Sequence, residues 1–434
     1  MKNGAALVKE DPTRVERGFL VGVYSKAEEL NVVRELLQEL GELTDTLGLE
    51  TVGSELVRIR EPNPRLLIGK GKAEEIARLA EEAGADVIIF DEFLSPSQQR
   101  NWEEMSNLAV IDRQEVILDI FASNARTSEA TLQVQLAKAN YDLPRLKRRW
   151  THLHRQAGTT GGMGARGEGE QQLELDSRAV RRNIAKLQRQ LDDVRQHREV
   201  QRARRMRKPF PVAAIVGYTN AGKSSLLNAL TDAGVLVEDK LFATLDPTVR
   251  RLKLPGGQDI LLTDTVGFIR KLPHTLIEAF KSTLEETVIA DFIIEVADAS
   301  TPGLDDRHVT TMDVLKQIGV AEKPTLMVLN KMDLVDDPVE VNRLRGRYPD
   351  SVFVSARRGD GLDDLARLMA GMLDAESREY SLFIPHSRHD IVSKVRLGCS
   401  IIDERHEADG VYLVVMAPRS QWSFVESWRR TEVV

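Results

Sequence analysis

A short glycine-containing segment near the middle of the chain limits the fold more than any other part of the sequence. It follows the apolar run 212–216, precedes the helical segment 225–230, and reads Gly217, Tyr218, Thr219, Asn220, Ala221, Gly222, Lys223 and Ser224. The glycines let backbone N–H groups wrap around phosphates, and the start of the following helix adds positive potential. We therefore predict a phosphate-binding loop in which Lys223 reaches the β- and γ-phosphates and the Ser224 hydroxyl binds Mg²⁺.

A second polar segment follows another apolar run in the order expected of a nucleotide-binding domain. After the run 260–262 the chain reads Asp264, Thr265, Val266 and Gly267. At this position the Asp264 carboxylate would hold Mg²⁺ through a water molecule, and the Gly267 N–H would sense the γ-phosphate.

The segments that would read the base come next along the chain. Asn330, Lys331, Met332 and Asp333 end the run 325–329, and Ser355 and Ala356 follow the run 352–354. The Asp333 carboxylate can accept two N–H groups of guanine, whereas adenine would leave it unpaired. Lys331 would cover the base, and backbone N–H groups at 355–356 would bind the guanine oxygen. These motifs together predict a GTP-binding domain over residues 209–375.

The threonine that closes on Mg²⁺ in the triphosphate state must lie between Lys223 and Asp264. The candidates are Thr244, which we prefer, and Thr248. We therefore expect Lys223, Thr244 and Gly267 to be the catalytic residues. Phe268 stands where many GTPases have a glutamine that orients the attacking water. Because an apolar ring cannot polarise water, we expect intrinsic hydrolysis to be slow.

The net charge of the chain is concentrated in one place. Residues 145–208 carry 18 Lys/Arg and 7 Asp/Glu, a net charge of +11, whereas residues 1–144 have a net charge of −10. This asymmetry predicts a polyanionic partner for the basic segment. A solvated helical surface is the simpler alternative.

The same region has the apolar spacing of paired helices. Apolar residues recur every three or four positions from Leu132 to Leu153 and from Val180 to Val194. We predict a helical hairpin over residues 125–208, with Pro144 as a kink and the six-glycine segment 157–170 as a flexible tip. A coiled-coil dimer is the alternative.

The two ends of the chain predict smaller domains. Residues 1–124 alternate strand-like and helical runs, which is typical of an α/β domain. Residues 376–434 predict an α+β domain with a strand at 380–384, a hairpin around Asp409-Gly410 and a helix at 421–430. The segment Gly69-Lys70-Gly71-Lys72 lacks the spacing of a phosphate loop, and we expect a turn with lysines facing RNA.

Composition excludes several other classes of protein. The one cysteine, Cys399, excludes an internal disulfide and cysteine-based metal clusters within a single chain. No apolar run approaches the roughly 18 residues of a membrane helix, and residues 1–18 lack the apolar core of a signal peptide. We therefore expect a cytoplasmic protein with no stable membrane insertion.

Longer strings of sequence resemble one known family. They are Phe242 to Thr248 (FATLDPT), Asp264 to His274 (DTVGFIRKLPH), Ala279 to Glu286 (AFKSTLEE), Asp91 to Arg100 (DEFLSPSQQR), Gly164 to Gln172 (GARGEGEQQ) and Leu175 to Arg178 (LDSR). The chain resembles the HflX GTPases of the Obg–HflX group over roughly residues 15–375.

The resemblance implies a function and a set of site residues. HflX proteins are cytoplasmic GTPases that bind the 50S ribosomal subunit, are stimulated by it, and split stalled or idle ribosomes under stress. The N-terminal domain and the hairpin would bind rRNA. By position, Mg²⁺ would be held by Ser224 and Thr244. The resemblance also adds residues to the GTP site: Phe242, Ala243, Leu245, Asp246 and Arg357.

Some alternatives stay open. A GTPase that assists 50S assembly would use the same chemistry, and an RNA-binding scaffold with a purely structural G domain would need none of it. A membrane-linked regulator has no support in the residues beyond peripheral association, which stays open as an alternative. We expect a monomer off the ribosome.

Overall fold

The computed structural model describes residues 15–146, 175, 177–194, 196, 210–231, 241–242, 247–255, 257–271, 281–375, 378–417 and 421–429. Contacts divide the chain into two compact units, Met1–Ser123 with Val134–Leu187, and Asn124–Gln133 with Gln188–Val434. Within the described ranges no helix has both the length and the apolar character needed to cross a bilayer.

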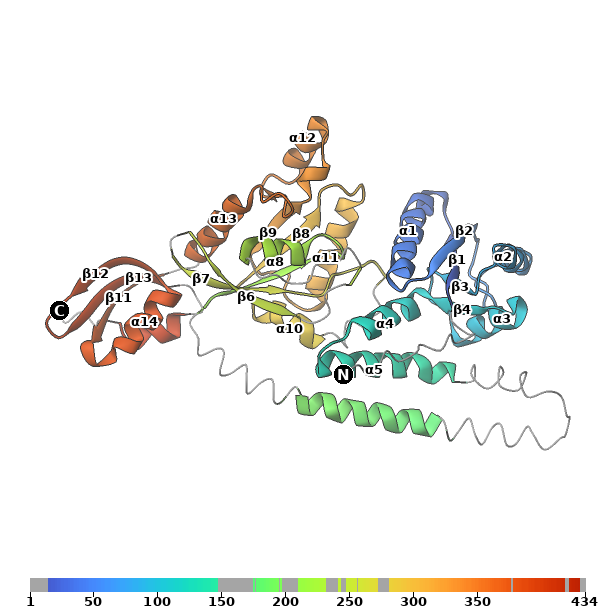
Figure 1. Cartoon of the computed structure of the whole chain (residues 1–434), viewed down its shortest axis with the longest axis horizontal. Coiled ribbons are helices and arrows are strands. Elements are labelled where there is room, and N and C mark those ends of the chain that lie inside the picture. Colours follow the sequence, from blue (N-terminus) through green and yellow to red (C-terminus); the bar gives the residue numbers. More distant parts are fainter. Residues whose placement is uncertain are drawn as a thin grey trace, which may run out of the picture. The chain divides into compact units, whose positions relative to one another are not determined.

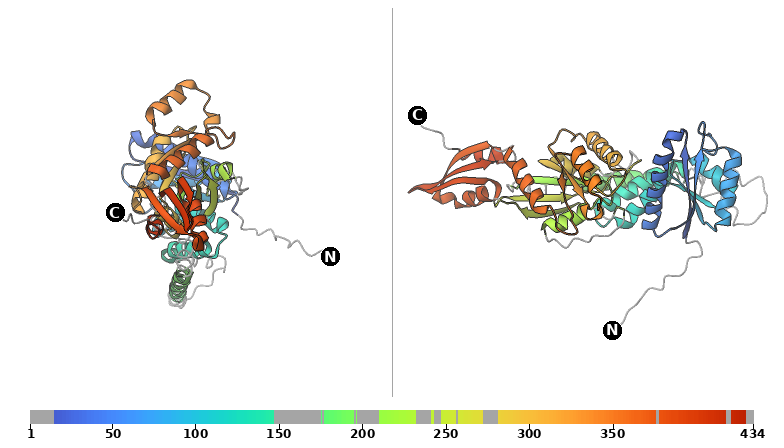
Figure 2. Two further views of the ribbon diagram at one scale, coloured as in Figure 1. Left: turned by 90° about the vertical axis from the view of Figure 1, so that its left-hand side faces the viewer. Right: turned by 90° about the horizontal axis from the view of Figure 1, so that it is seen from above.

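The N-terminal domain is a parallel sheet covered by helices on both faces (Figures 1 and 2). Its strands have the order β2-β1-β3-β4 and span β1 (Arg17–Tyr24), β2 (Glu50–Arg58), β3 (Val87–Phe90) and β4 (Ala109–Asp112). Its helical elements are η1 (Ala27–Glu29), α1 (Leu30–Thr46), α2 (Lys70–Glu82), α3 (Pro96–Ser106) and α4 (Arg113–Asn124). The α/β class predicted for this part of the chain is confirmed, although the sequence pattern did not indicate β2 or α4.

Helix α3 is held by contacts that its sequence encodes locally. Ser95 and Gln98 form a capping box, and Pro96 occupies the first helical position, where its missing N–H has no cost. The indole of Trp102 is buried, donates to the Leu66 carbonyl at 2.7 Å, and packs edge-on against Phe90. These contacts fix α3 and the loop before α2 to the sheet.

The middle region is helical where the structure describes it. Helix α5 (Ser128–Asp142) is followed by a 3₁₀ turn, η2 (Leu143–Arg145), and residues 177–194 form a further helix. The α-helix therefore changes to a 3₁₀ turn at Pro144, the residue predicted to kink the arm, and the rest of that arm lies outside the described residues. The predicted glycine-rich tip at 157–170 lies outside the described residues.

The G domain is built on a six-stranded sheet of order β10-β9-β8-β5-β7-β6. The strands are β5 (Val212–Gly217), β6 (Thr248–Lys253), β7 (Asp259–Asp264), β8 (Phe292–Asp298), β9 (Thr325–Asn330) and β10 (Val352–Phe353). The helical elements are α8 (Lys223–Thr231), α10 (Lys281–Ile289), α11 (Leu304–Gln317), η3 (Met332–Leu334), α12 (Pro338–Arg347) and α13 (Leu362–Ala375). All strand pairs are parallel except β6–β7.

The strand order places the phosphate loop at the centre of this sheet. Strand β5 pairs with β7 on one side and with β8 on the other, so the direction of chain progression reverses at β5. Open α/β sheets bind ligands at the carboxyl ends of strands beside such a reversal. The loop after Gly217 begins at this position.

The C-terminal domain is an antiparallel sheet of order β11-β13-β12. It comprises β11 (Arg378–Pro385), η4 (His386–Arg388), α14 (His389–Gly398), β12 (Ser400–His406), β13 (Gly410–Ala417) and α15 (Trp422–Glu426). The α+β class and the hairpin before Gly410 are confirmed. The predicted helix at 421–430 was too long, because the chain turns after Glu426 and the Trp428 carbonyl accepts the Phe383 N–H of β11.

Candidate nucleotide site

Close packing explains why glycines bracket the loop after β5. Gly217 has a φ of 145°, and a Cβ there would lie 2.1 Å from the Val296 carbonyl oxygen. Gly222 has a φ of 89°, and a Cβ there would lie 2.3 Å from the Asn330 amide nitrogen. Both glycines are therefore required by backbone conformation and by contact with neighbouring strands.

Lys223 lies inside this loop. Its side chain is buried, and Nζ donates to the Tyr218 carbonyl at 2.8 Å. Burial lowers the pKa of Lys223 to about 8, and the nearby Asp264 carboxylate only partly opposes that shift. A phosphate brought to this ammonium would favour its charged form.

Ser224 and Asp264 lie together beside the lysine. The Ser224 hydroxyl donates to the Asp264 carboxylate at 2.6 Å, and Asp264 is fully buried at the carboxyl end of β7. A hydroxyl and a carboxylate are the hard oxygen ligands that Mg²⁺ prefers. These two side chains fit a magnesium site. Within the described ranges no group of three or more His, Cys, Asp or Glu could hold a metal by itself.

The segment after Asp264 is tied to the phosphate loop by its backbone. The Phe268 N–H donates to the Gly217 carbonyl at 3.0 Å, and the Thr219 N–H donates to the Phe268 carbonyl at 2.7 Å. The Phe268 ring is buried among side chains of β5, β8, α10 and α11. The ring therefore packs into the hydrophobic core of the G domain. A Cβ at Gly267 would lie 2.9 Å from Lys223 Nζ, so this glycine approaches the lysine closely.

Asn330 joins the phosphate loop to the loop after β10. Its amide donates to the Ala221 carbonyl at 2.9 Å, and its oxygen accepts the Ala356 N–H at 3.0 Å. Lys331 has a φ of 63° and pairs with Asp298 at 2.8 Å. The role of Asp298 was not predicted. The sequence could have indicated it, because Asp298 ends β8 and the neighbouring strand β9 leads into the segment predicted to read the base.

Asp333 is held ready as an acceptor. Its carboxylate accepts the Ser355 hydroxyl at 2.7 Å, and the Arg358 N–H donates to that hydroxyl oxygen at 3.1 Å. The Ser355 hydrogen bond holds the pKa of Asp333 below its usual value, with smaller help from Arg358 and Arg357. Asp333 stays ionised at neutral pH, as an acceptor of two guanine N–H groups must.

The remaining predicted site residues divide into three groups. Phe242, Thr219, Ala221, Thr265 and Val266 are buried, whereas Asn220 and Arg357 are exposed and Met332 is half-buried. Ala243, Thr244, Leu245 and Asp246 lie outside the described residues. Thr248, the second switch candidate, begins β6 directly opposite Asp264.

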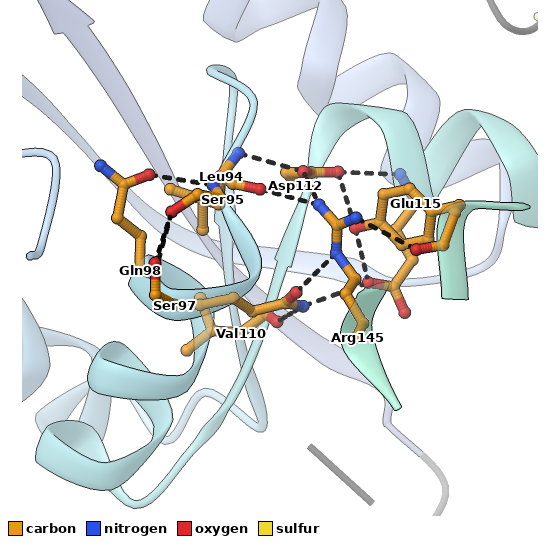
Figure 3. A network of polar contacts seen from close by, with 10 residues as sticks. Leu94, Ser95, Ser97, Gln98, Val110, Asp112, Glu115 and Arg145 are labelled. Atoms are coloured by element: carbon orange, nitrogen blue, oxygen red, sulfur yellow. Dashed lines mark hydrogen bonds and ion pairs between the residues drawn. The ribbon is translucent and has the colours of Figure 1, made fainter. Parts of the chain in front are cut away.

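A second polar network lies at the root of the middle region (Figure 3). The Arg145 guanidinium donates to the Leu94 carbonyl at 2.7 Å and to the Gln99 side chain at 3.0 Å, and approaches Asp112 at 3.4 Å. It also stacks over the Tyr141 ring at 3.6 Å. Arg145 is the first residue of the basic segment 145–208, and its side chain contacts the N-terminal domain.

The Gly69 to Lys72 segment also differs from its prediction. Gly69 caps α2, which begins at Lys70, so the segment starts a helix. Lys70 is exposed, as expected, but Lys72 is paired with Glu55 and Glu75, each at 2.9 Å.

Three family models match successive parts of the chain. The models are described as GTP-binding GTPase N-terminal over residues 34–122, GTP-binding GTPase Middle Region over residues 124–205, and 50S ribosome-binding GTPase over residues 212–331. Among solved structures, a GTP-binding protein from *Sulfolobus solfataricus* in complex with GDP is 24% identical, with a TM-score of 0.42. The alignment covers 82% of this chain and 98% of that one.

The strand order, the phosphate loop and these family models define a P-loop GTPase, an enzyme that hydrolyses GTP. The GTPase HflX of *Akkermansia muciniphila* is 45% identical, covering 97% of this chain and 98% of the relative. The GTPase HflX of *Escherichia coli* K12 is 40% identical, covering 94% and 95%. The chain belongs to the HflX family, as the resemblance in its sequence implied.

Proposed function

We propose that this protein binds the 50S ribosomal subunit, is stimulated by it to hydrolyse GTP, and splits stalled or idle 70S ribosomes under stress. One observation supports the enzymatic part most directly. Lys223, the Ser224–Asp264 pair and the Asp333–Ser355 pair lie at or after the carboxyl ends of β5, β7, β9 and β10 in one sheet. The ribosomal part is supported by membership in a family whose G domain is described as 50S ribosome-binding.

The chain's own residues suggest how the site would work. Ser224 and Thr244 would hold Mg²⁺ directly and Asp264 through water, and the ion would neutralise charge on the β- and γ-phosphates. Lys223 would contact the same phosphates, and the Gly267 N–H would face the γ-phosphate. Asp333 would accept two N–H groups of guanine, with Lys331 over the base and residues 355–357 beside it.

Slow intrinsic turnover is part of the proposal. The Phe268 ring is buried and carries no group that orients water. The group that does so would come from elsewhere, and stimulation by the 50S subunit is consistent with that need. The protein would be cytoplasmic and monomeric off the ribosome.

The basic middle region would be the part that reaches rRNA. Its net charge of +11 between acidic flanks favours binding to a polyanion. Assistance in 50S assembly is the second candidate function, since it would use the same site and the same charge. An RNA-binding scaffold with a purely structural G domain would not need the side chains described above, so these residues argue against that function.

Removal of the glycine-rich segment tests the splitting proposal. A variant lacking residues 158–169 should keep its basal GTPase activity, because the side chains proposed to bind GTP lie in the G domain. It should lose most of its ability to dissociate 70S ribosomes, measured as a fall in light scattering. Splitting at the wild-type rate would mean that the segment is only a linker. Failure to split by the full-length protein itself would favour the assembly role.

A further inference from the structure

Tyr218 is the first residue of the phosphate loop that has a side chain, and this side chain contacts the segment after Gly267. Tyr218 is buried, and its hydroxyl accepts the backbone N–H of Arg270 at 2.7 Å. Arg270 lies three residues after Gly267. The Tyr218 side chain therefore holds the backbone that follows Gly267, the glycine proposed to face the γ-phosphate.

This hydrogen bond extends a backbone ladder. The residue pair Tyr218 and Phe268 forms a parallel bridge, in which the Phe268 N–H donates to Gly217 and the Thr219 N–H donates to Phe268. Those two bonds hold the segment at Phe268, and the Tyr218 hydroxyl holds it two residues further on. Residues 267–270 are thus fixed to the loop at two successive points.

The Tyr218 ring is itself held from the side of α11. The Arg307 guanidinium lies 4.8 Å from the ring centroid, in cation–π geometry, and also donates to the Thr301 hydroxyl at 3.3 Å. The ring therefore cannot swing away without losing this contact. Arg307 therefore supports the segment through the Tyr218 ring.

The position of Gly267 leaves little room for error. A Cβ there would lie 2.9 Å from Lys223 Nζ and 2.9 Å from the Thr219 Cα. A misplacement of about 1 Å near the reacting atoms can cost up to a hundredfold in rate. A contact that fixes the backbone just after Gly267 is therefore a means of controlling hydrolysis separately from binding.

We propose that Tyr218 is a positioning residue for GTP hydrolysis, whose hydroxyl holds residues 267–270 against the phosphate loop so that the Gly267 N–H faces the γ-phosphate. This rests on the role proposed above for Gly267. The Tyr218 hydroxyl bonds Arg270 and is not among the groups proposed above to bind the base or the phosphates. Its removal should act on turnover more than on affinity.

The test is Tyr218→Phe, which removes the hydroxyl and keeps the ring and its contact with Arg307. We expect kcat to fall about fivefold to tenfold, because the half-buried Arg270 N–H loses this acceptor, while KM and the affinity for GDP stay within about twofold. Amide hydrogen exchange at residues 267–271 should become faster. Arg307→Gln should change kcat in the same direction and by less.

Tyr348→Phe is the matched control, since it removes a tyrosine hydroxyl that bonds Asp305 in the same domain, away from the phosphate loop. It should leave kcat, KM and exchange at 267–271 unchanged. The proposal is overturned if Tyr218→Phe keeps wild-type kcat, or if kcat and GDP affinity fall together. Lys223→Ala separates this failure from that of the site itself: retained GTP affinity and turnover in that variant would refute the site.

Discussion

Single residues in the nucleotide site act through the loops that they join. Asn330 bonds both the phosphate loop and the loop after β10, and Ser355 bonds Asp333. Each contact joins segments that are distant in sequence. The chain's own contacts therefore hold the expected binding surface together, and a preorganised surface lowers the ordering cost of binding.

The proposed selection of guanine depends on Asp333. In Asp333→Asn, one guanine N–H would face an amide donor instead of a carboxylate oxygen, so GTP affinity should fall at least about a hundredfold. Affinity for xanthosine triphosphate should rise, because its ring offers the complementary acceptor. Competition binding with both nucleotides measures the change. Asp336→Asn, an exposed neighbour, is the control, and an unchanged GTP preference in Asp333→Asn would refute the base-reading role.

Proton uptake on nucleotide binding reports on Lys223. With a pKa of about 8 in the free protein, the ammonium is half-charged at pH 8, and triphosphate binding should raise that pKa. Binding at pH 8 should therefore take up about half a proton, and at pH 7 about a tenth. Affinity should fall as the pH rises above 8. Calorimetry in two buffers of different ionisation enthalpy measures the uptake, and equal heats in both at pH 8 would contradict this assignment.

At the scale of elements, the buried central strands and the edge strand β10 were predicted, whereas the edge strands β2 and β6 were not. Strands β5, β8 and β9 are nearly continuous apolar runs, as expected of parallel strands covered on both faces. Strands β2 and β6 lie at sheet edges and mix charged with apolar residues, which weakens the pattern. The end of α5 depends on Pro144, whose local effect the sequence does indicate.

The candidate site was predictable to a similar extent. Motif residues such as Lys223, Ser224 and Asp264 carry their chemistry in short strings that follow strands. The residues that contact these motifs from other segments are not marked by such strings. Asp298 beside Lys331 and Arg145 beside Asp112 are contacts between distant segments, and no spacing within one segment indicates them.

The hydrogen bonds and the ion pair of Arg145 should stabilise the contact between the start of the middle region and the N-terminal domain. Burial raises the pKa of Asp112, although Arg145 and hydrogen bonds oppose that shift. Arg145→Gln should lower the free energy of unfolding of the N-terminal domain by about 2 kcal/mol, through lost charge-assisted hydrogen bonds. It should leave basal GTP turnover unchanged. Chemical denaturation of the whole chain measures the stability of this domain.

A surface arginine provides the comparison for that experiment. Arg78→Gln breaks an exposed pair with Glu82, which we expect to contribute less than about 1 kcal/mol. If both variants lose the same small amount, the network in Figure 3 contributes no more than a surface ion pair.

At the scale of the whole molecule, the chain combines a G domain, in which a buried phenylalanine follows Gly267, with a basic middle region. The first feature predicts slow hydrolysis without a partner, and the second predicts that the partner is RNA-rich. High salt should therefore weaken association with the subunit while leaving basal turnover little changed, because only the former depends on many phosphate contacts.

The most direct test of this account is GTP turnover by the full chain with purified 50S subunits, with 30S subunits as the control. We predict strong stimulation by 50S subunits and none by 30S subunits, starting from a slow basal rate. Equal turnover with 50S, with 30S and without either would contradict the central claim that the large subunit activates this GTPase.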